Sequence, residues 1–143
     1  MISEVENKYV IFKLKEEYYG IPIANVLSIE RIEEITRVPN APKYVMGVIN
    51  LRGEVIPLVD LGMRLDIDAG DYNRDSRIIV TSVDDIIAGL VVDSSSEVLE
   101  IDKDSIDPPP DTNNGRCIEF LNGVGKIDNR LIILLNLPKV LEY

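Results

Sequence analysis

The sequence contains no histidine. Histidine is the commonest physiological acid–base group and the commonest imidazole ligand of metals, so its absence counts against catalysis and against a metal site. A hydrolase built on two carboxylates would need them in one cleft, in environments that separate their pKa values. The acidic pairs here, Glu16-Glu17, Glu33-Glu34 and Asp84-Asp85, instead fall at predicted turns. We therefore expect no enzymatic activity and no cofactor.

Cysteine and long apolar runs are also scarce. The single Cys117 cannot form a disulfide within the chain, which favours a reducing compartment. No uninterrupted apolar run approaches the roughly 20 residues that span a bilayer. The acidic N-terminus lacks the basic and apolar regions of a signal peptide. These absences predict a cytoplasmic protein with no direct membrane insertion.

Basic residues are outnumbered, with 15 lysines and arginines against 25 acidic residues and a formal net charge of −10. A field of this sign repels nucleic-acid phosphates and anionic lipid headgroups. The six tyrosines and two phenylalanines are not accompanied by a run of lysine or arginine, which a nucleic-acid-binding barrel would need. Nucleic acid is therefore not an expected partner.

What the sequence does contain is a series of short segments rich in valine and isoleucine, which suit a pleated, half-buried strand. Residues 45–61 read as two such strands joined at Leu51-Arg52-Gly53-Glu54. Gly53 can adopt a positive φ without a Cβ penalty, so it suits a hairpin turn there. Two prolines interrupt residues 38–42, and residues 64–74 are polar and predict a long connection.

The second half of the chain repeats the first. Gly20-Ile21-Pro22-Ile23 recurs 69 residues later as Gly89-Leu90-Val91-Val92, and the same offset relates Ile29 to Val98. An offset of 76 relates Gly53 to Asn129, and asparagine also tolerates a left-handed backbone. Each copy holds roughly five short strands, which usually close into a barrel and so hide the sheet edges. We expect an all-β fold of two packed barrels, approximately residues 9–65 and 76–141, with exchange of terminal strands left open.

A set of motifs, present in order from about Tyr9 to Leu141, resembles one family. The motifs are Tyr19-Gly20-Ile21-Pro22-Ile23, Val38-Pro39-Asn40-Ala41-Pro42, Gly47-Val48-Ile49-Asn50-Leu51-Arg52-Gly53, Ile56-Pro57-Leu58-Val59-Asp60-Leu61, Gly89-Leu90-Val91-Val92-Asp93 and Gly123-Val124-Gly125-Lys126. They resemble CheW, the family of bacterial chemotaxis coupling proteins. The resemblance implies one CheW-like domain over residues 1–143, made of two SH3-like five-stranded barrels with short helical turns.

The resemblance also implies a function without chemistry. CheW-like proteins couple the cytoplasmic tips of methyl-accepting chemoreceptors to the regulatory domain of the histidine kinase CheA, in arrays associated with the membrane. The receptor's helical hairpin would lie in an apolar groove between the barrels. The groove positions carried over are Val10, Ile23, Val26, Ser28, Ile29 and Val98. Barrel core is the alternative for each aliphatic one, and Ser28 lacks the charge of the glutamate that many relatives carry there.

Arg52, Gly53 and Asp93 are predicted to be structural or interface residues. Arg52 either contacts the kinase or receptor, or bonds carbonyls across the barrel junction, and its five donors suit both roles. Asp93 is either its partner or a turn former. The alternative reading of the whole chain is a CheW-like regulatory domain of a larger protein, CheA or a receiver fusion. The initial Met1 and the end just past the last strand favour a free-standing coupling protein.

Overall fold

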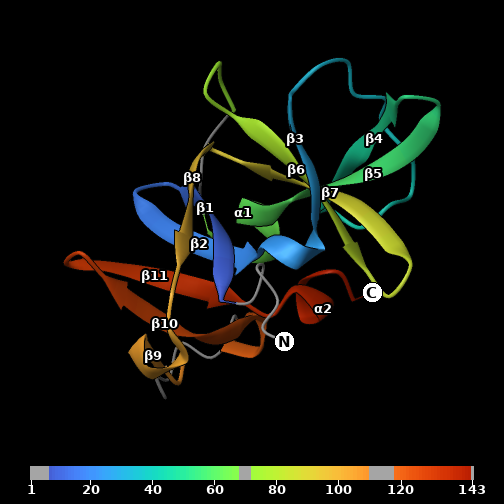
Figure 1. The fold of residues 1–143 in the computed structure, drawn as a ribbon. Helices are drawn as coiled ribbons and strands as arrows, with labels where there is room; N and C mark the ends of the chain where they lie inside the picture. The colour runs from blue at the N-terminus through green and yellow to red at the C-terminus, as the bar shows by residue number, and fades with distance from the viewer. Residues whose placement is uncertain (1–6, 68–71, 110–117, 143) are drawn as a thin grey trace.

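A computed structural model describes residues 7–67, 72–109 and 118–142, and it is built mainly of β-strands (Figure 1). The strands are β1 (Lys8–Leu14), β2 (Glu17–Pro22), β3 (Val26–Arg31), β4 (Val45–Leu51), β5 (Glu54–Asp60), β6 (Arg77–Val83), β7 (Ile86–Val92), β8 (Ser94–Glu100), β9 (Ile106–Asp107), β10 (Leu121–Ile127) and β11 (Arg130–Leu135). The helices are α1 (Leu61–Arg64) and α2 (Leu137–Val140), with the 3₁₀ turns η1 (Ile23–Asn25), η2 (Lys103–Ser105) and η3 (Ile118–Phe120). Within the described ranges, no helix is long and apolar enough to cross a membrane.

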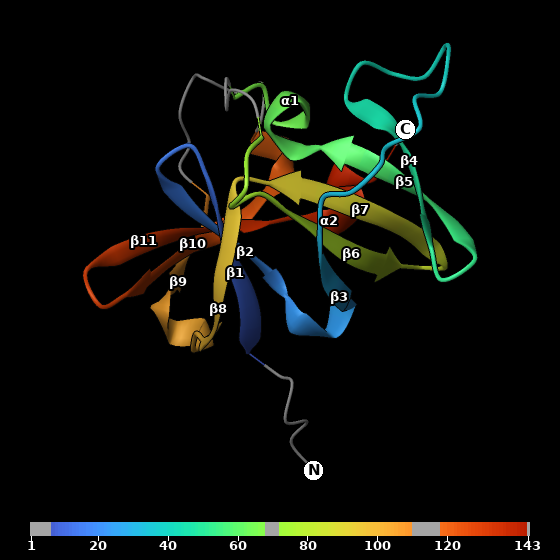
Figure 2. The ribbon, with the colours of Figure 1, turned by 90° about the horizontal axis from the view of Figure 1, so that it is seen from above.

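Each of the two sheets takes strands from both halves of the chain. The first sheet has the order β8-β1-β2-β11-β10-β9 and the second has the order β3-β6-β7-β5-β4 (Figure 2). The two copies of the repeat therefore exchange their first two strands, and a parallel pair joins the copies in each sheet, β11 with β2 and β5 with β7. The units expected at residues 9–65 and 76–141 correspond to the copies of the repeat, and each sheet mixes strands of both.

Each sheet closes because the chain crosses from one sheet edge to the other. After β3, Thr36 exchanges both backbone hydrogen bonds with Val48 of β4, with N···O distances of 2.9 and 2.8 Å. After β8, the chain returns as β9 and pairs with β10 at the far edge of the first sheet. A Cβ on Gly47 would lie 2.3 Å from the Thr36 carbonyl oxygen, so this crossing requires glycine.

These closures confirm the all-β prediction of two SH3-like barrels. We call the first sheet barrel 1 and the second barrel 2. Barrel 1 has the two-residue β9 as a sixth strand, whereas the same crossing in barrel 2 is a single bridge between Thr36 and Val48.

Among the described residues, the apolar core has three parts, because the central strands are buried on both faces. Alternate residues of β1 separate: Ile11 packs inside barrel 1, while Val10 and Phe12 pack in the core between the barrels. The equivalent strand β6 does the same, with Ile78 inside barrel 2 and Ile79 between the barrels. Burial on both faces explains why these strands read as continuous apolar runs rather than as alternating patterns.

Candidate functional site at the seam between the barrels

Two exposed aliphatic side chains mark the seam, one on the edge strand of each barrel. Ile29 of β3 lies directly opposite Ile79 of β6, and Val98 of β8 lies directly opposite Val10 of β1. Directly opposite residues of an antiparallel pair present their side chains on the same face. Ile79 and Val10 belong to the core between the barrels, so Ile29 and Val98 continue that core outward onto the surface. They are 45% and 49% exposed.

Val10 has a different place from the one expected for a groove residue. Its side chain is only 2% exposed and lies in the core between the barrels. A partner cannot reach it without opening that core. Val10 and Val98 have the same side chain and face, but β1 is covered by neighbours on both sides and β8 is a sheet edge.

Between these two edges, η1 bridges the barrels. It contacts both β1 and β6, and Figure 1 shows β3 and β8 on either side of it. Asn25 holds it to β6 by donating to the Ser82 carbonyl over 3.0 Å. Ile23 and Val26, which flank Ala24 and Asn25, are half-buried and pack against the core between the barrels. We call Ile23, Val26, Ile29 and Val98 the seam face.

Ser28 does not share this face. It is opposite Val80, which is 1% exposed and belongs to the core inside barrel 2. A β-bulge between Val26 and Ser28 makes this change of face possible. Val26 is opposite Thr81 and Ser28 is opposite Val80, so β3 has one more residue than β6 over this interval. Ser28 is half-buried and lines a pocket of about 190 Å³ with Arg52 and Glu54.

The Arg52-Gly53 turn is the predicted hairpin, and both residues have positive φ, 51° and 88°. The Gly53 N–H donates to Asn50 Oδ1 over 3.0 Å, which fixes the turn. Asp128 and Asn129 adopt the same conformation in the second copy, with φ of 49° and 63°. Arg52 projects from the hairpin as an exposed side chain and makes no hydrogen bond or ion pair to another described residue.

Asp93 is a turn former and lies at the other barrel. Its Oδ2 accepts from the Lys15 N–H at 2.5 Å, and its own N–H donates to the Lys13 carbonyl at 3.0 Å. These contacts hold the turn between β1 and β2 to the link between β7 and β8. The Arg52–Asp93 pair considered from the sequence is therefore replaced by backbone bonding of Asp93.

Arg64, the last residue of α1, bonds carbonyls across the barrel junction, which is one of the two roles predicted from the sequence for Arg52. It donates to the carbonyls of Val140, Lys139 and Glu142 at the end of α2, over 3.0, 3.3 and 2.5 Å. Its guanidinium also lies 4.3 Å from the Tyr44 ring centroid and 4.9 Å from that of Phe120. Asp60 caps the start of α1 by accepting from the Met63 N–H, and so helps to place Arg64 at the end of this helix.

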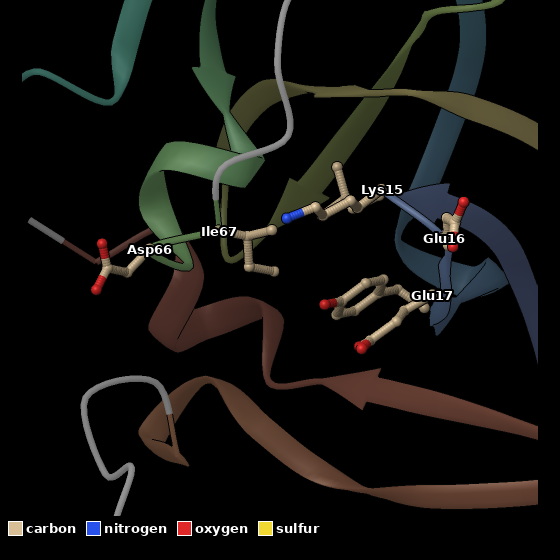
Figure 3. Close-up of a pocket in the computed structure, with 7 residues that line it drawn as sticks. Lys15, Glu16, Glu17, Asp66 and Ile67 are labelled. Atoms are coloured by element: carbon tan, nitrogen blue, oxygen red, sulfur yellow. The ribbon is translucent and has the colours of Figure 1, made fainter.

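A pocket of about 720 Å³ lies where the β1–β2 turn approaches the segment after α1 (Figure 3). In the figure, the Lys15 side chain reaches toward Ile67. Glu16 and Asp66 complete a lining of mixed charge. This pocket is separate from the seam face, with which it shares no residue.

The shifted pKa values of three side chains are explained by burial or by ion pairs. Burial raises the pKa of the Tyr9 phenol. The hydrogen bond that Lys126 donates to Asp107 over 2.9 Å raises the pKa of Lys126, and the hydrogen bond that Arg130 donates to Glu97 raises the pKa of Arg130. Among the described residues, no group of three or more potential ligands is placed to hold a metal ion.

Comparisons with known proteins agree along the whole chain. A family model described as the CheW-like domain matches residues 8–143. The chemotaxis protein CheW of Helicobacter pylori is 38% identical over 94% of this chain and 81% of its own length, and that of Bacillus subtilis is 31% identical over 99% and 92%. A crystal structure of the scaffolding protein TtCheW from Thermoanaerobacter tengcongensis superposes with a TM-score of 0.89 at 39% identity, covering 96% of this chain and 93% of that one.

Proposed function

The chain belongs to the CheW family and acts as a chemotaxis scaffold, and we propose that it couples the cytoplasmic tips of chemoreceptors to the histidine kinase CheA. In this proposal it binds the regulatory domain of CheA and a receptor's helical hairpin at the same time. Its place in the cell is then at the membrane-bound receptor arrays, held there by protein contacts and without catalysis of its own.

The observation that supports receptor binding is the seam face. Ile29 and Val98 are half-exposed aliphatic side chains at equivalent positions of the two copies, and both continue the core between the barrels. A helix that lays an apolar stripe on a partner needs such a surface, because its anchors recur at helical spacing. Ile23 and Val26 supply half-buried apolar area between the two edges.

A direct test is titration calorimetry of the purified protein with two separate probes. One probe is the CheA regulatory domain and the other is a receptor signalling fragment that contains the hairpin tip. We expect saturable binding of each at protein concentrations of roughly 100 μM, since a Kd near 1 μM would already saturate there. A protein that binds neither probe would overturn the coupling function.

A further inference from the structure

The pocket beside Ser28 occupies the place where the other barrel has an ion pair. Offsets of 69 and 76 relate Ser28 to Glu97, Ile87 to Tyr18 and Glu54 to Arg130. The strand registers bear this out: Ser28 is opposite Val80, as Glu97 is opposite Ile11. The two sites are therefore the same point of the fold, once in each barrel.

In barrel 1 an ion pair between two of the barrel's own side chains, Arg130 and Glu97, occupies this point. Arg130 Nη1 lies 2.5 Å from Glu97 Oε1, so β11 is joined to the edge strand β8. The guanidinium also lies 4.9 Å from the centroid of the Tyr18 ring. About a quarter to a third of each charged side chain is exposed, 26% for Arg130 and 31% for Glu97. A charge-assisted hydrogen bond thus closes the gap between the edge strand and the hairpin.

In barrel 2 the same gap is open. The pocket of about 190 Å³ there is lined by Ser28 and Glu54, with buried Ile56 and Val80 and the half-buried Ile87 behind them. Ser28 stands on the edge strand where barrel 1 has Glu97, and Glu54 stands where barrel 1 has Arg130. Glu54 is exposed and has no ion pair or hydrogen bond to another described side chain.

The surroundings of the gap are acidic. A second pocket, about 260 Å³, adjoins the first through Leu51 and is lined by Glu30, Glu33 and Glu34 as well as by Arg31. Together with Glu54 and Arg52, the two pockets present four carboxylates against two guanidiniums. The net charge of −10 adds to this field. A cation is therefore favoured over an anion at this position.

We propose that this pocket receives a lysine or arginine side chain of the chemoreceptor hairpin, which pairs with Glu54 and completes the ion pair that barrel 1 makes internally. The receptor is chosen because β3 carries the seam face on one side, at Val26 and Ile29, and the pocket on the other, at Ser28. β3 is an edge strand of barrel 2, so a helix that lies along this edge can reach both faces. This inference rests on the proposed receptor binding.

The test uses the whole protein and the receptor signalling fragment in calorimetry. Glu54→Gln removes the charge without changing the shape, and we expect the receptor Kd to rise by about tenfold and to depend less on salt. Glu16→Gln is the matched control, because it makes the same change of charge on the β1–β2 turn of barrel 1. It should leave the receptor Kd within about twofold.

A double variant tests whether the barrel 2 pocket is equivalent to the site of the Arg130–Glu97 ion pair in barrel 1. Ser28→Glu with Glu54→Arg transplants the barrel 1 pair into barrel 2, so we expect a folded protein whose pocket is closed and whose receptor binding is weaker than that of Glu54→Gln. Circular dichroism and the unchanged affinity for the CheA regulatory domain would confirm folding. A receptor fragment in which one basic residue at the tip is reversed to glutamate should regain affinity for Glu54→Lys.

The possible results separate this inference from the coupling function. If the wild-type protein binds the receptor and Glu54→Gln binds equally well, the pocket is not a receptor contact and the coupling function stands. If Arg52→Gln weakens binding while Glu54→Gln does not, the pocket takes an acidic side chain and the inference is wrong. Loss of CheA binding alone on Glu54→Gln would also overturn it. If the wild-type protein does not bind the receptor fragment, the proposed coupling function is wrong, and with it the inference that rests on it.

Discussion

The Arg64 guanidinium donates from Nε to the Val140 carbonyl oxygen over 3.0 Å and so joins the helix that follows β5 to the helix that follows β11. The two helices are equivalents in the repeat, and each begins at a side-chain cap, Asp60 for α1 and Asn136 for α2. Four-residue helices leave most of their terminal carbonyls without partners. Arg64 donates to two of those of α2, Lys139 and Val140, and to the Glu142 carbonyl just beyond it, across the junction of the barrels.

Replacing Arg64 by methionine should therefore destabilise the protein. Methionine keeps much of the apolar stem but leaves the carbonyls of α2 and the rings of Tyr44 and Phe120 without their cation. We expect the free energy of unfolding to fall by about 2 kcal/mol, measured by urea denaturation. Arg52→Met is the control and should change it by less than about 0.5 kcal/mol, because Arg52 is exposed. Equal effects of the two substitutions would contradict the junction role of Arg64.

The turn at Gly53 gives a second prediction. Its φ of 88° disfavours a β-branched residue, and an added Cβ would meet no atom within 4 Å. Gly53→Val should thus lower the thermal midpoint through backbone strain alone, at a cost of about 1–2 kcal/mol. Asn129→Gly, at the equivalent turn, should be neutral or mildly stabilising. An unchanged midpoint for Gly53→Val would show that the turn relaxes to another conformation without cost.

The turns and the repeat could be predicted from the sequence because both are local or periodic signals. Gly53 and Asn129 mark turns by their own backbone preferences, and an offset of 69 or 76 is visible without a structure. The exchange of strands between the copies is not visible in the same way. Two equivalent copies carry equivalent strand patterns, so the sequence satisfies pairing within a copy as well as pairing between copies.

The site was harder to predict, because exposure depends on place in the sheet rather than on residue type. Val10 and Val98 are the same residue in paired positions, yet one lies on a central strand and the other on an edge. Arg64 was missed because its partners lie some 75 residues away in α2, and nothing in the polar segment beginning at Arg64 points to them.

Tyr9 gives a prediction about pH. Burial raises the pKa of its phenol above the ordinary value of 10.0, so the folded state disfavours the phenolate. Stability that depends on this group is complete below the unfolded pKa and is lost as the pH rises through the folded pKa. We expect the free energy of unfolding to fall above about pH 10, and to fall less steeply in Tyr9→Phe. The exposed Tyr72→Phe should follow the wild type; identical curves for all three proteins would show that Tyr9 ionises freely.

The pairing of Val98 with Val10 gives the sharpest test of the seam face. Val98 is 49% exposed, so the glutamate in Val98→Glu can stay hydrated and should cost little stability. The same charge in Val10→Glu would be buried at a position only 2% exposed, where an unpaired carboxylate costs several kcal/mol. We expect Val98→Glu to fold, to keep its affinity for the CheA regulatory domain and to lose binding of the receptor fragment. Ile29→Glu, the equivalent change on β3, should behave alike, whereas Val10→Glu should be unfolded or insoluble. A folded Val98→Glu protein with undiminished receptor binding would remove Val98 from the contact surface, and a molten one would place it in the core.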